Sequence, residues 1–290
     1  MTMTTTANDR AAELLERLHT QVAALITGED WQAWLRVAAR FHRYSFNNLL
    51  LIYAQRPDAT HVAGYRHWQI LGRQVRRGEH AIAILAPCAH RITDTDDDTD
   101  ETTVHTIIRG LRAASVFDIT QTDGDPLSTP TAPALVDSTA PADLLKRVTA
   151  EISAAGFTYE CAPLPAMHAG ANGLTDHTTR TVTVRPNLPN AHAAKTAAHE
   201  LAHVLMHGPD RAAGLTRAHV EVEAESVAYI VCNAAGLDPA GYSFPYVAAW
   251  SAGDHTVIAA TATRVLTTAR TIIDRLELAP SSTDPERTSI

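Results

Sequence analysis

The stretch that most constrains this chain is the pentad His199-Glu200-Leu201-Ala202-His203, an HExxH motif. On a helix, residues four apart lie one above the other, so His199 and His203 present both imidazoles on one face. Imidazoles at this spacing are typical zinc ligands, and zinc also takes a third protein ligand and a water molecule. The metal lowers the pKa of that water, so that Glu200 beside it can act as general base. The motif therefore predicts a Zn2+ site with hydrolytic chemistry and Glu200 as its catalytic residue.

The residues around the motif support a helix that is buried on most sides. Nearly every other position between Lys195 and Met206 is apolar or small, and buried ionisable groups need partners. The alternative interpretation is a core helix whose histidines are satisfied by neighbouring carbonyl groups. His207 continues the four-residue spacing, but Gly208 and Pro209 follow it. We therefore interpret His207 as a helix-ending residue rather than a ligand.

The third metal ligand is expected on the next helix, predicted over Arg217 to Asn233. Glu221, Ala224, Glu225 and Ala228 share one stripe of that helix at positions i, i+3, i+4 and i+7. The small alanine side chains on this stripe allow close approach to the motif helix. We predict Glu221 as the third ligand and Glu225 as the carboxylate that orients a metal-bound histidine.

Other assignments for this segment stay open or are excluded. An HExxHxxGxxH site is excluded because Met206 and Pro209 occupy the required glycine and histidine positions. His219 is a rival for the third ligand. The acidic residues can instead serve only to favour a helix N-terminus, and Glu223, on another face from Glu221, is expected to be solvated.

A second feature of the chain is a local basic block in a protein whose net charge is −8. Between Trp31 and His90 there are eight arginines and only two acidic residues. Aromatic residues lie between these arginines, and together they offer cations for phosphates and flat rings for unpaired bases. On the basis of charge and hydrogen-bonding chemistry, the predicted contacts with single-stranded DNA are Arg40, His42, Tyr44, Asn47, Arg73, Arg76 and Arg77.

The plain alternative for this block is that the aromatic residues form a hydrophobic core. Aromatic side chains at helical spacing are usually buried, and Trp31 and Trp34 are expected to be core residues for this reason. Tyr65 and Trp68 belong to the same aromatic series. Residue types alone therefore do not decide between a core and a nucleic-acid surface.

Length and composition bound the architecture. The 290 residues, 45% of them apolar, are enough for two domains of an α+β protein. There is no apolar run of the length that a membrane span needs, and the three scattered cysteines fit a reducing cytoplasm. We expect a disordered tail over 1–8, a DNA-binding domain over 9–119, a linker over 120–142, a metallopeptidase-like domain over 143–279 and a frayed tail over 280–290.

Within these boundaries the patterns predict particular elements. Helices are expected over 9–25, 31–41, 143–155, 217–233 and 257–276. Strands are expected over 74–75 and 81–86, joined by a turn at Arg77-Gly78, and over 104–108 and 113–119 after an acidic loop at 94–101. Two further strands are expected over 157–161 and 181–185.

The motif helix and the segment Thr216 to Glu225 together resemble the metallopeptidase-like domain of the ImmA/IrrE group and of ArdC-type antirestriction proteins. The resemblance implies a zincin-like fold in which two histidines and the glutamate of an E-x-x-A element hold zinc. That element falls on Glu221 and Ala224. The resemblance covers about the last half of the chain.

The N-terminal part resembles the N-terminal domain of ArdC-type proteins in several ordered blocks. These include Phe41 to Asn48, Val62 to Tyr65, and Leu71 to Glu79 followed by Ile82 to Ile84. The resemblance implies binding of single-stranded DNA and protection of incoming or mobile DNA from restriction. The other interpretation is a regulatory zinc endopeptidase that cleaves a repressor or another protein substrate in response to DNA.

Overall fold

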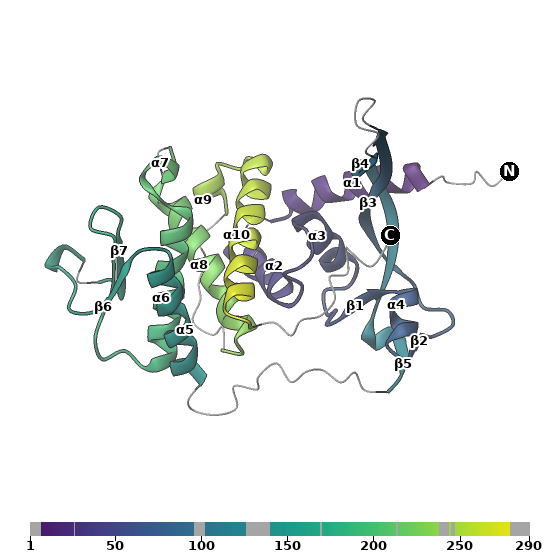
Figure 1. The fold of residues 1–290 in the computed structure, drawn as a ribbon. Helices are drawn as coiled ribbons and strands as arrows, with labels where there is room; N and C mark the ends of the chain where they lie inside the picture. The colour runs from purple at the N-terminus through teal and green to yellow at the C-terminus, as the bar shows by residue number, and fades with distance from the viewer. Residues whose placement is uncertain are drawn as a thin grey trace. The chain divides into compact units, whose positions relative to one another are not determined.

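The computed structural model describes residues 7–25, 27–95, 102–125, 140–168, 170–212, 214–237, 244 and 247–278. It has the mixed α+β architecture that the sequence predicts (Figure 1). The chain forms two compact units. The first unit comprises Met1–Gln21, Asn47–Asp125 and Thr283–Ile290, and the second comprises Val22–Phe46 and Pro126–Ser282. None of the described helices combines the length and apolar character that a membrane span requires.

The first unit contains two small antiparallel sheets. The longer strands β3 (Ile82–Thr95) and β4 (Thr102–Asp118) pair with each other, and β1 (Val62–Gly64) pairs with the other side of β4. A second sheet joins β2 (Arg73–Val75) to β5 (Thr122–Gly124). The remaining elements are most of α1 and α3, helix α4 and the 3-10 helix η1, with the bounds Ala7–Ala23, Phe46–Gln55, Tyr65–Ile70 and Ile119–Gln121.

Helix α3 covers the free edge of β3 through two side-chain amides. Asn48 donates to the carbonyl of Leu85 at 2.8 Å and accepts from its N–H at 2.9 Å. Gln55 makes the same pair of bonds with Ala83, at 2.8 and 2.9 Å. These amides take the place of a neighbouring strand, so the backbone groups of the β3 edge are satisfied here.

The sequence-based elements of this unit are confirmed in part. The strands expected over 104–108 and 113–119 form one continuous strand, β4, which contains Gly110 at φ 100°. β2 pairs with β5 rather than with the strand that follows the Arg77-Gly78 turn, and β5 lies inside the segment expected to be a linker. Residues 96–101 of the acidic loop lie outside the described residues. So do the expected tails, except that Ala7 and Asn8 begin α1.

The second unit packs helices against a small mixed sheet. Its sheet has the order β6-β8-β7, with β6 (Thr158–Cys161) parallel and β7 (Gly173–Asp176) antiparallel to β8 (Thr181–Val184). Figure 1 shows α6, α8 and α10 side by side, and α8 contacts the other two. The helices are α2 (Gly28–Arg40), α5 (Ala140–Ala154), α6 (Asn190–Met206), α7 (Pro209–Ala212), α8 (Arg217–Ala234), α9 (Val247–Ser251) and α10 (His255–Arg275), with a short η2 (Ala166–His168).

Helix α2 is part of the core of this second unit. Trp31 and Trp34 are both fully buried, which confirms that they are core residues. Trp31 Nε1 donates to Ser226 Oγ on α8 at 2.9 Å, and its ring centroid lies 5.1 Å from that of Trp250. Residues 22–46 therefore group with the C-terminal elements, although their sequence lies inside the segment expected as the DNA-binding domain.

Candidate metal centre

Helix α6 places the two motif histidines one turn apart, as the four-residue spacing predicts. His199 Nε2 and His203 Nε2 lie 3.0 Å apart, and the side chains are 18% and 13% exposed. The face of α6 beneath them is made of small residues: Ala197, Ala198 and Ala202 are fully buried. The helix can therefore pack closely on both sides while the two imidazoles reach a shared opening.

Helix α8 supplies the third candidate ligand. It begins after Thr216, whose side chain accepts from the backbone N–H of His219, and Ala224 and Ala228 are fully buried on its stripe. Glu221 Oε2 lies 3.4 Å from His199 Nε2 and 3.9 Å from His203 Nε2.

One oxygen and two imidazole nitrogens thus lie within 4.8 Å of one another, so these three residues could hold a metal ion. Two nitrogen donors and a carboxylate are a donor set that suits Zn2+ and related divalent cations, and three protein ligands leave a position for water. The arrangement matches the predicted ligand set, and the ligand roles themselves stay a proposal.

Glu200 lies in the same opening and is almost fully buried. Thr175 Oγ1, on β7, donates to Glu200 Oε2 at 2.6 Å. Burial raises the pKa of Glu200, although the neighbouring His199 and the bond from Thr175 oppose that rise. A buried carboxylate with a raised pKa is suited to accept and release a proton.

Gly173 lets β7 approach this carboxylate. A Cβ atom added at Gly173 would lie 2.5 Å from Glu200 Oε1 and 2.7 Å from Thr196 Cγ2. No side chain fits at that distance without displacing Glu200. Sequence reasoning left this Gly- and His-rich segment unassigned, because nothing in the sequence shows that Gly173 and Thr175 meet the motif helix.

Glu225 lies beside His199, and its predicted orienting role stays a prediction. Its Oε2 lies 3.0 Å from His199 Nδ1, and its Oε1 forms an ion pair with Lys195 Nζ at 3.0 Å. Burial alone would lower the pKa of His199, but hydrogen bonds to Glu221 and Glu225 raise it to about 9. Burial and the neighbouring His199 lower the pKa of His203 to about 3. A metal ion would therefore displace one proton from His199 on binding.

The expectation that Glu223 is solvated is wrong. Its side chain is 1% exposed, and Arg264 on α10 donates to Glu223 Oε1 through Nε at 2.8 Å and also through a terminal nitrogen. Burial opposes ionisation, but hydrogen bonds from His207, His219 and Arg264 lower the pKa of Glu223 to about 2. Glu223 does point away from Glu221, but α10 rather than solvent covers that face of α8.

His219 and His207 are also placed away from the ligand cluster. His219 Nε2 lies 2.7 Å from Thr261 Oγ1 and 3.2 Å from Arg264, so the rival third ligand is engaged elsewhere. His207 ends α6, as predicted, and its ring is buried between His203 and Glu223.

The candidate centre opens into a cavity of ≈ 590 Å³. Helices α6 and α8, the 3-10 helix η2 and strand β7 contribute to its wall, and the three candidate ligands line it. Histidines without an assigned role in the sequence, His168 and His177, also line it. The cavity is also lined by His199, Glu200, His203, Glu221, Glu225 and Gly173.

The predicted DNA contacts are divided between the two units. Arg40, His42 and Tyr44 belong to the second unit, whereas Asn47, Arg73, Arg76 and Arg77 belong to the first. Arg40 and Asn47 are exposed.

Two of these predicted contacts are partly or wholly buried: the ring of Tyr44 is covered, and both ring nitrogens of His42 are buried. Tyr44 is 4% exposed and its ring meets Phe41 edge-on, at a centroid distance of 6.2 Å. Burial and the nearby Arg43 lower the pKa of His42, and its carbonyl accepts from Arg270 at 2.8 and 3.0 Å. Both residues act as parts of the second unit's packing, and Tyr44 has no open face for base stacking.

The three arginines beside β2 have different surroundings. Arg73 donates to the side chain and carbonyl of Thr122 and to the carbonyls of Gly124 and Asp125. Arg76 pairs with Glu79 and, at 3.4 Å, with Asp123.

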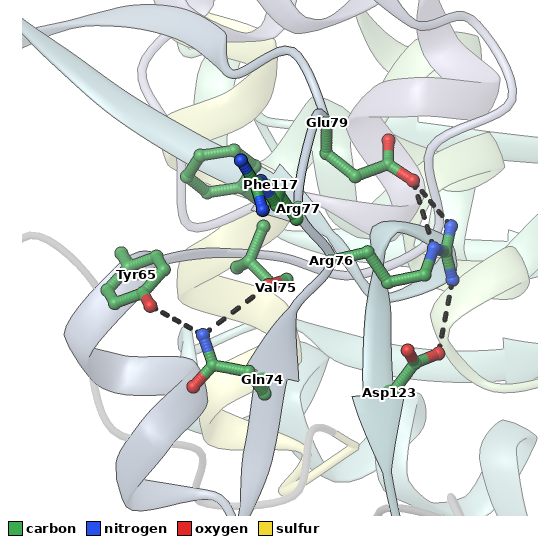
Figure 2. A pocket seen from close by; sticks show the side chains of 8 residues that line it. All are labelled: Tyr65, Gln74, Val75, Arg76, Arg77, Glu79, Phe117 and Asp123. Atoms are coloured by element: carbon green, nitrogen blue, oxygen red, sulfur yellow. Dashed lines mark hydrogen bonds and ion pairs between the residues drawn. The ribbon is translucent and has the colours of Figure 1, made fainter.

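Arg77 differs from these two neighbours. It is exposed, and within the described part of the chain no hydrogen bond or ion pair involves it. Figure 2 shows its side chain among those that line an open pocket, together with Phe117, Tyr65 and Gln74. Tyr65 is 45% exposed, and its ring lies 6.4 Å from that of Phe117. Phe117 was not singled out from the sequence, because its strand pattern fits a core residue equally well.

Comparison with protein-family models gives two matches. Residues 7–117 match the N-terminal domain of anti-restriction factor ArdC, and residues 156–235 match the IrrE N-terminal-like domain of the M78 peptidases. The second range contains both motif histidines, Glu200 and Glu221.

Among curated proteins, the chain is 23% identical over 277 residues to an uncharacterized protein from Bacillus anthracis. The match covers 84% of this chain and 47% of the relative, so the chain spans about half the length of that relative. Two crystal structures of the antirestriction ArdC protein from the R388 plasmid, one metal-free and one with Mn(II) bound, are each 20% identical with a TM-score of 0.48. The matches cover 82% and 84% of this chain and 86% and 97% of theirs.

The two family matches follow one another along the chain and account for both features found in the sequence, the basic and aromatic block and the HExxH helix. The chain therefore carries, in order, a region that matches the N-terminal domain of anti-restriction factor ArdC, over residues 7–117, and a region that matches the IrrE N-terminal-like domain, over residues 156–235.

Proposed function

We propose that this chain is an antirestriction-type protein that binds single-stranded DNA, protects incoming or mobile DNA, and carries a zinc-dependent peptidase site. The convergence of His199, His203 and Glu221 around one point, with the buried Glu200 in the same cavity, carries the peptidase part. The proposed setting is the cytoplasm, and the three cysteines form no disulfide with one another.

In this proposal, His199 and His203 would hold Zn2+ through their imidazole nitrogens, and Glu221 would hold it through a carboxylate oxygen. The ion supplies Lewis acidity toward a water molecule and a peptide carbonyl. Glu200 takes the proton of the attacking water and passes it to the leaving amine, so its protonation state is restored. Thr175 holds the Glu200 carboxylate in place through its 2.6 Å bond.

The edge strand beside the cavity supports a polypeptide substrate. β7 pairs with β8 on one side, and it is the last strand of the described sheet on the other. An extended peptide could add to that edge through backbone hydrogen bonds, which places a peptide bond next to Glu200.

A cleavage assay with an unfolded protein such as casein tests the peptidase part. Zinc-loaded protein should cleave, and Glu200→Gln should lower the rate by roughly a hundredfold to ten-thousandfold while zinc content stays the same. Thr178→Ala, an exposed change on the turn after β7, is the matched control and should keep the rate. Equal rates for Glu200→Gln and the wild type would contradict the assigned base.

The pocket beside β2 supports the DNA part of the proposal. Arg77 offers an exposed cation for a phosphate, and Tyr65 and Phe117 offer rings beside it for an unpaired base. Arg73 and Arg76 hold the surrounding loop through their own contacts. We therefore propose Arg77 as the main phosphate contact of this unit.

Fluorescence anisotropy with a labelled oligonucleotide tests this site. Tyr65→Ala should cost about 1–3 kcal/mol of binding free energy, and Arg77→Ala should weaken binding and flatten its salt dependence. Arg36→Ala, an exposed arginine of the second unit, is the matched control. The DNA site is wrong if all three variants bind single strands as the wild type does.

A regulatory endopeptidase is the second candidate function, and the presence of both sites in one chain favours it. Such a protein would cleave a repressor or another protein when DNA is bound. This second function predicts that single-stranded DNA changes the cleavage rate of the zinc-loaded full chain. A rate that is the same with and without DNA would leave the DNA-binding, antirestriction-type role.

A further inference from the structure

A chain of buried polar side chains continues beyond His203, and the proposed reaction does not use it. His203 Nδ1 lies 2.9 Å from His207 Nδ1, and His207 Nε2 lies 3.0 Å from Glu223 Oε2. The side chains of His207 and Glu223 are 3% and 1% exposed. Polar groups at this depth are costly unless each bond is made with a matching donor and acceptor.

The distances allow one arrangement of protons when His203 binds a metal. A metal on His203 Nε2 needs the lone pair of that atom, so the ring proton must be on Nδ1. His203 Nδ1–H then donates to His207 Nδ1, which has to accept. His207 therefore carries its proton on Nε2 and donates it to Glu223, which accepts as a carboxylate.

The Glu223 end of this series of hydrogen-bonded side chains is anchored by α10 and by the first turn of α8. Arg264 donates to Glu223 Oε1, and His219 Nε2 lies 3.4 Å from the same oxygen. These contacts occupy Oε1 and leave Oε2 for His207. The Glu223 carboxylate is therefore held in one orientation, and the direction of hydrogen bonding along the chain is fixed from this end.

We propose that His207 and Glu223 are positioning residues that fix the tautomer and ring orientation of His203, so that its Nε2 faces the metal. This inference rests on the proposed metal site. His199 receives the same support directly from Glu225, at 3.0 Å. The two imidazoles are therefore held in different ways. The carboxylate of Glu225 holds His199 directly, whereas His203 is held by His207, which in turn bonds to the carboxylate of Glu223.

Nitrogen-15 NMR of the imidazole rings in the zinc-loaded full chain tests the proton arrangement without a substitution. His203 should show a protonated Nδ1, and His207 should show an unprotonated Nδ1 with a protonated Nε2. A protonated Nδ1 on His207 would overturn the proposal. Absence of bound zinc in the wild-type protein would instead overturn the metal site itself.

Chelator competition gives a second readout that does not depend on activity. His207→Met removes the acceptor and the donor, and zinc affinity should fall roughly tenfold to a hundredfold. His207→Gln keeps one acceptor and one donor and should recover part of that loss. His192→Met changes a histidine in the same cavity wall and should leave the affinity unchanged. A folded His207→Met variant with wild-type zinc affinity would overturn the proposal.

Discussion

The cavity beside α6 and the pocket beside β2 are both lined with charged side chains, but the charges are satisfied in different ways. Around the cavity, His199, His203 and Glu221 direct their polar atoms toward one shared point. Beside β2, Arg73 is bound by backbone carbonyls at β5, and Arg76 is bound by the carboxylates of Glu79 and Asp123. Side chains that converge on open space indicate a ligand, whereas side chains that satisfy one another indicate structure.

The origin of this difference lies in local geometry. His199 and His203 are on one helix, where the spacing along the sequence fixes their spacing in space. The arginines near β2 are on a strand and a turn, where the direction of each side chain depends on which strand pairs with β2. Pairing with β5 brought Thr122 and Asp123 next to the arginines, so Arg73 and Arg76 have partners within the protein.

The largest expected effect tests the packing that supports the cavity. Trp31→Ala should lower the free energy of unfolding of the second unit by about 3–5 kcal/mol, because the ring is fully buried and bonds to Ser226 on α8. Denaturant unfolding of the full chain measures this loss, and Arg36→Ala, at an exposed position of the same helix, is the control. A loss in the first unit instead would contradict the grouping of α2 with the C-terminal elements.

Next in size is the effect of filling the space that Gly173 leaves. Gly173→Ala should lower the cleavage rate by about a hundredfold, since the new Cβ would displace the Glu200 carboxylate. Zinc content should stay the same because the proposed ligands His199, His203 and Glu221 are on α6 and α8. Gly170→Ala, where no atom lies within 4 Å of the added Cβ, is the matched control. If Gly173→Ala cleaves the substrate as fast as the wild type and Gly170→Ala do, the position of the Glu200 carboxylate does not matter for the reaction.

A smaller effect concerns the pH dependence of the cavity's charges. The folded pKa of His199, about 9, lies above its unfolded value near 6.5. In metal-free protein this group stabilises the fold fully below about pH 6.5, and the contribution is lost as pH rises through 9.

Zinc must displace the same proton, so zinc affinity should rise with pH up to about 9, by at most about tenfold per pH unit. Chelator-buffered zinc titrations at several pH values measure this pH dependence of the affinity. Glu225→Gln removes one of the bonds that raise this pKa, so it should flatten the dependence. A zinc affinity that does not change over this range would contradict the protonation of His199.

The smallest expected effect sharpens the comparison on the side of the β2 pocket. Arg73→Ala should lower the free energy of unfolding of the first unit by about 1 kcal/mol, because it removes bonds to Thr122 and Gly124. Its effect on single-strand binding should be smaller than that of Arg77→Ala. The reverse order of these two binding losses would show that Arg73 contacts DNA and that its loop contacts are replaceable.

Glu223 shows where reasoning from the sequence reached its limit. The helical stripe correctly placed Glu223 and Glu221 on different faces, since residues two positions apart on a helix point in different directions. That pattern could not show that α10 covers this face, because Arg264 is distant in the sequence. A helix pattern shows where a side chain points relative to its own axis, and only packing decides whether solvent or another helix lies there.

The sequence by itself determined the mixed α+β class, the positions of α5, α6, α8 and α10 within a few residues, and the pairing of His199 with His203. These properties follow from local spacing and from the polar or apolar character of neighbouring residues. The tertiary structure decided that α2 belongs with the second unit, that β2 pairs with β5, and that Gly173 and Thr175 meet Glu200. Each of these depends on segments far apart in the chain, and their contact is set by shape and burial across the whole fold rather than by any local pattern.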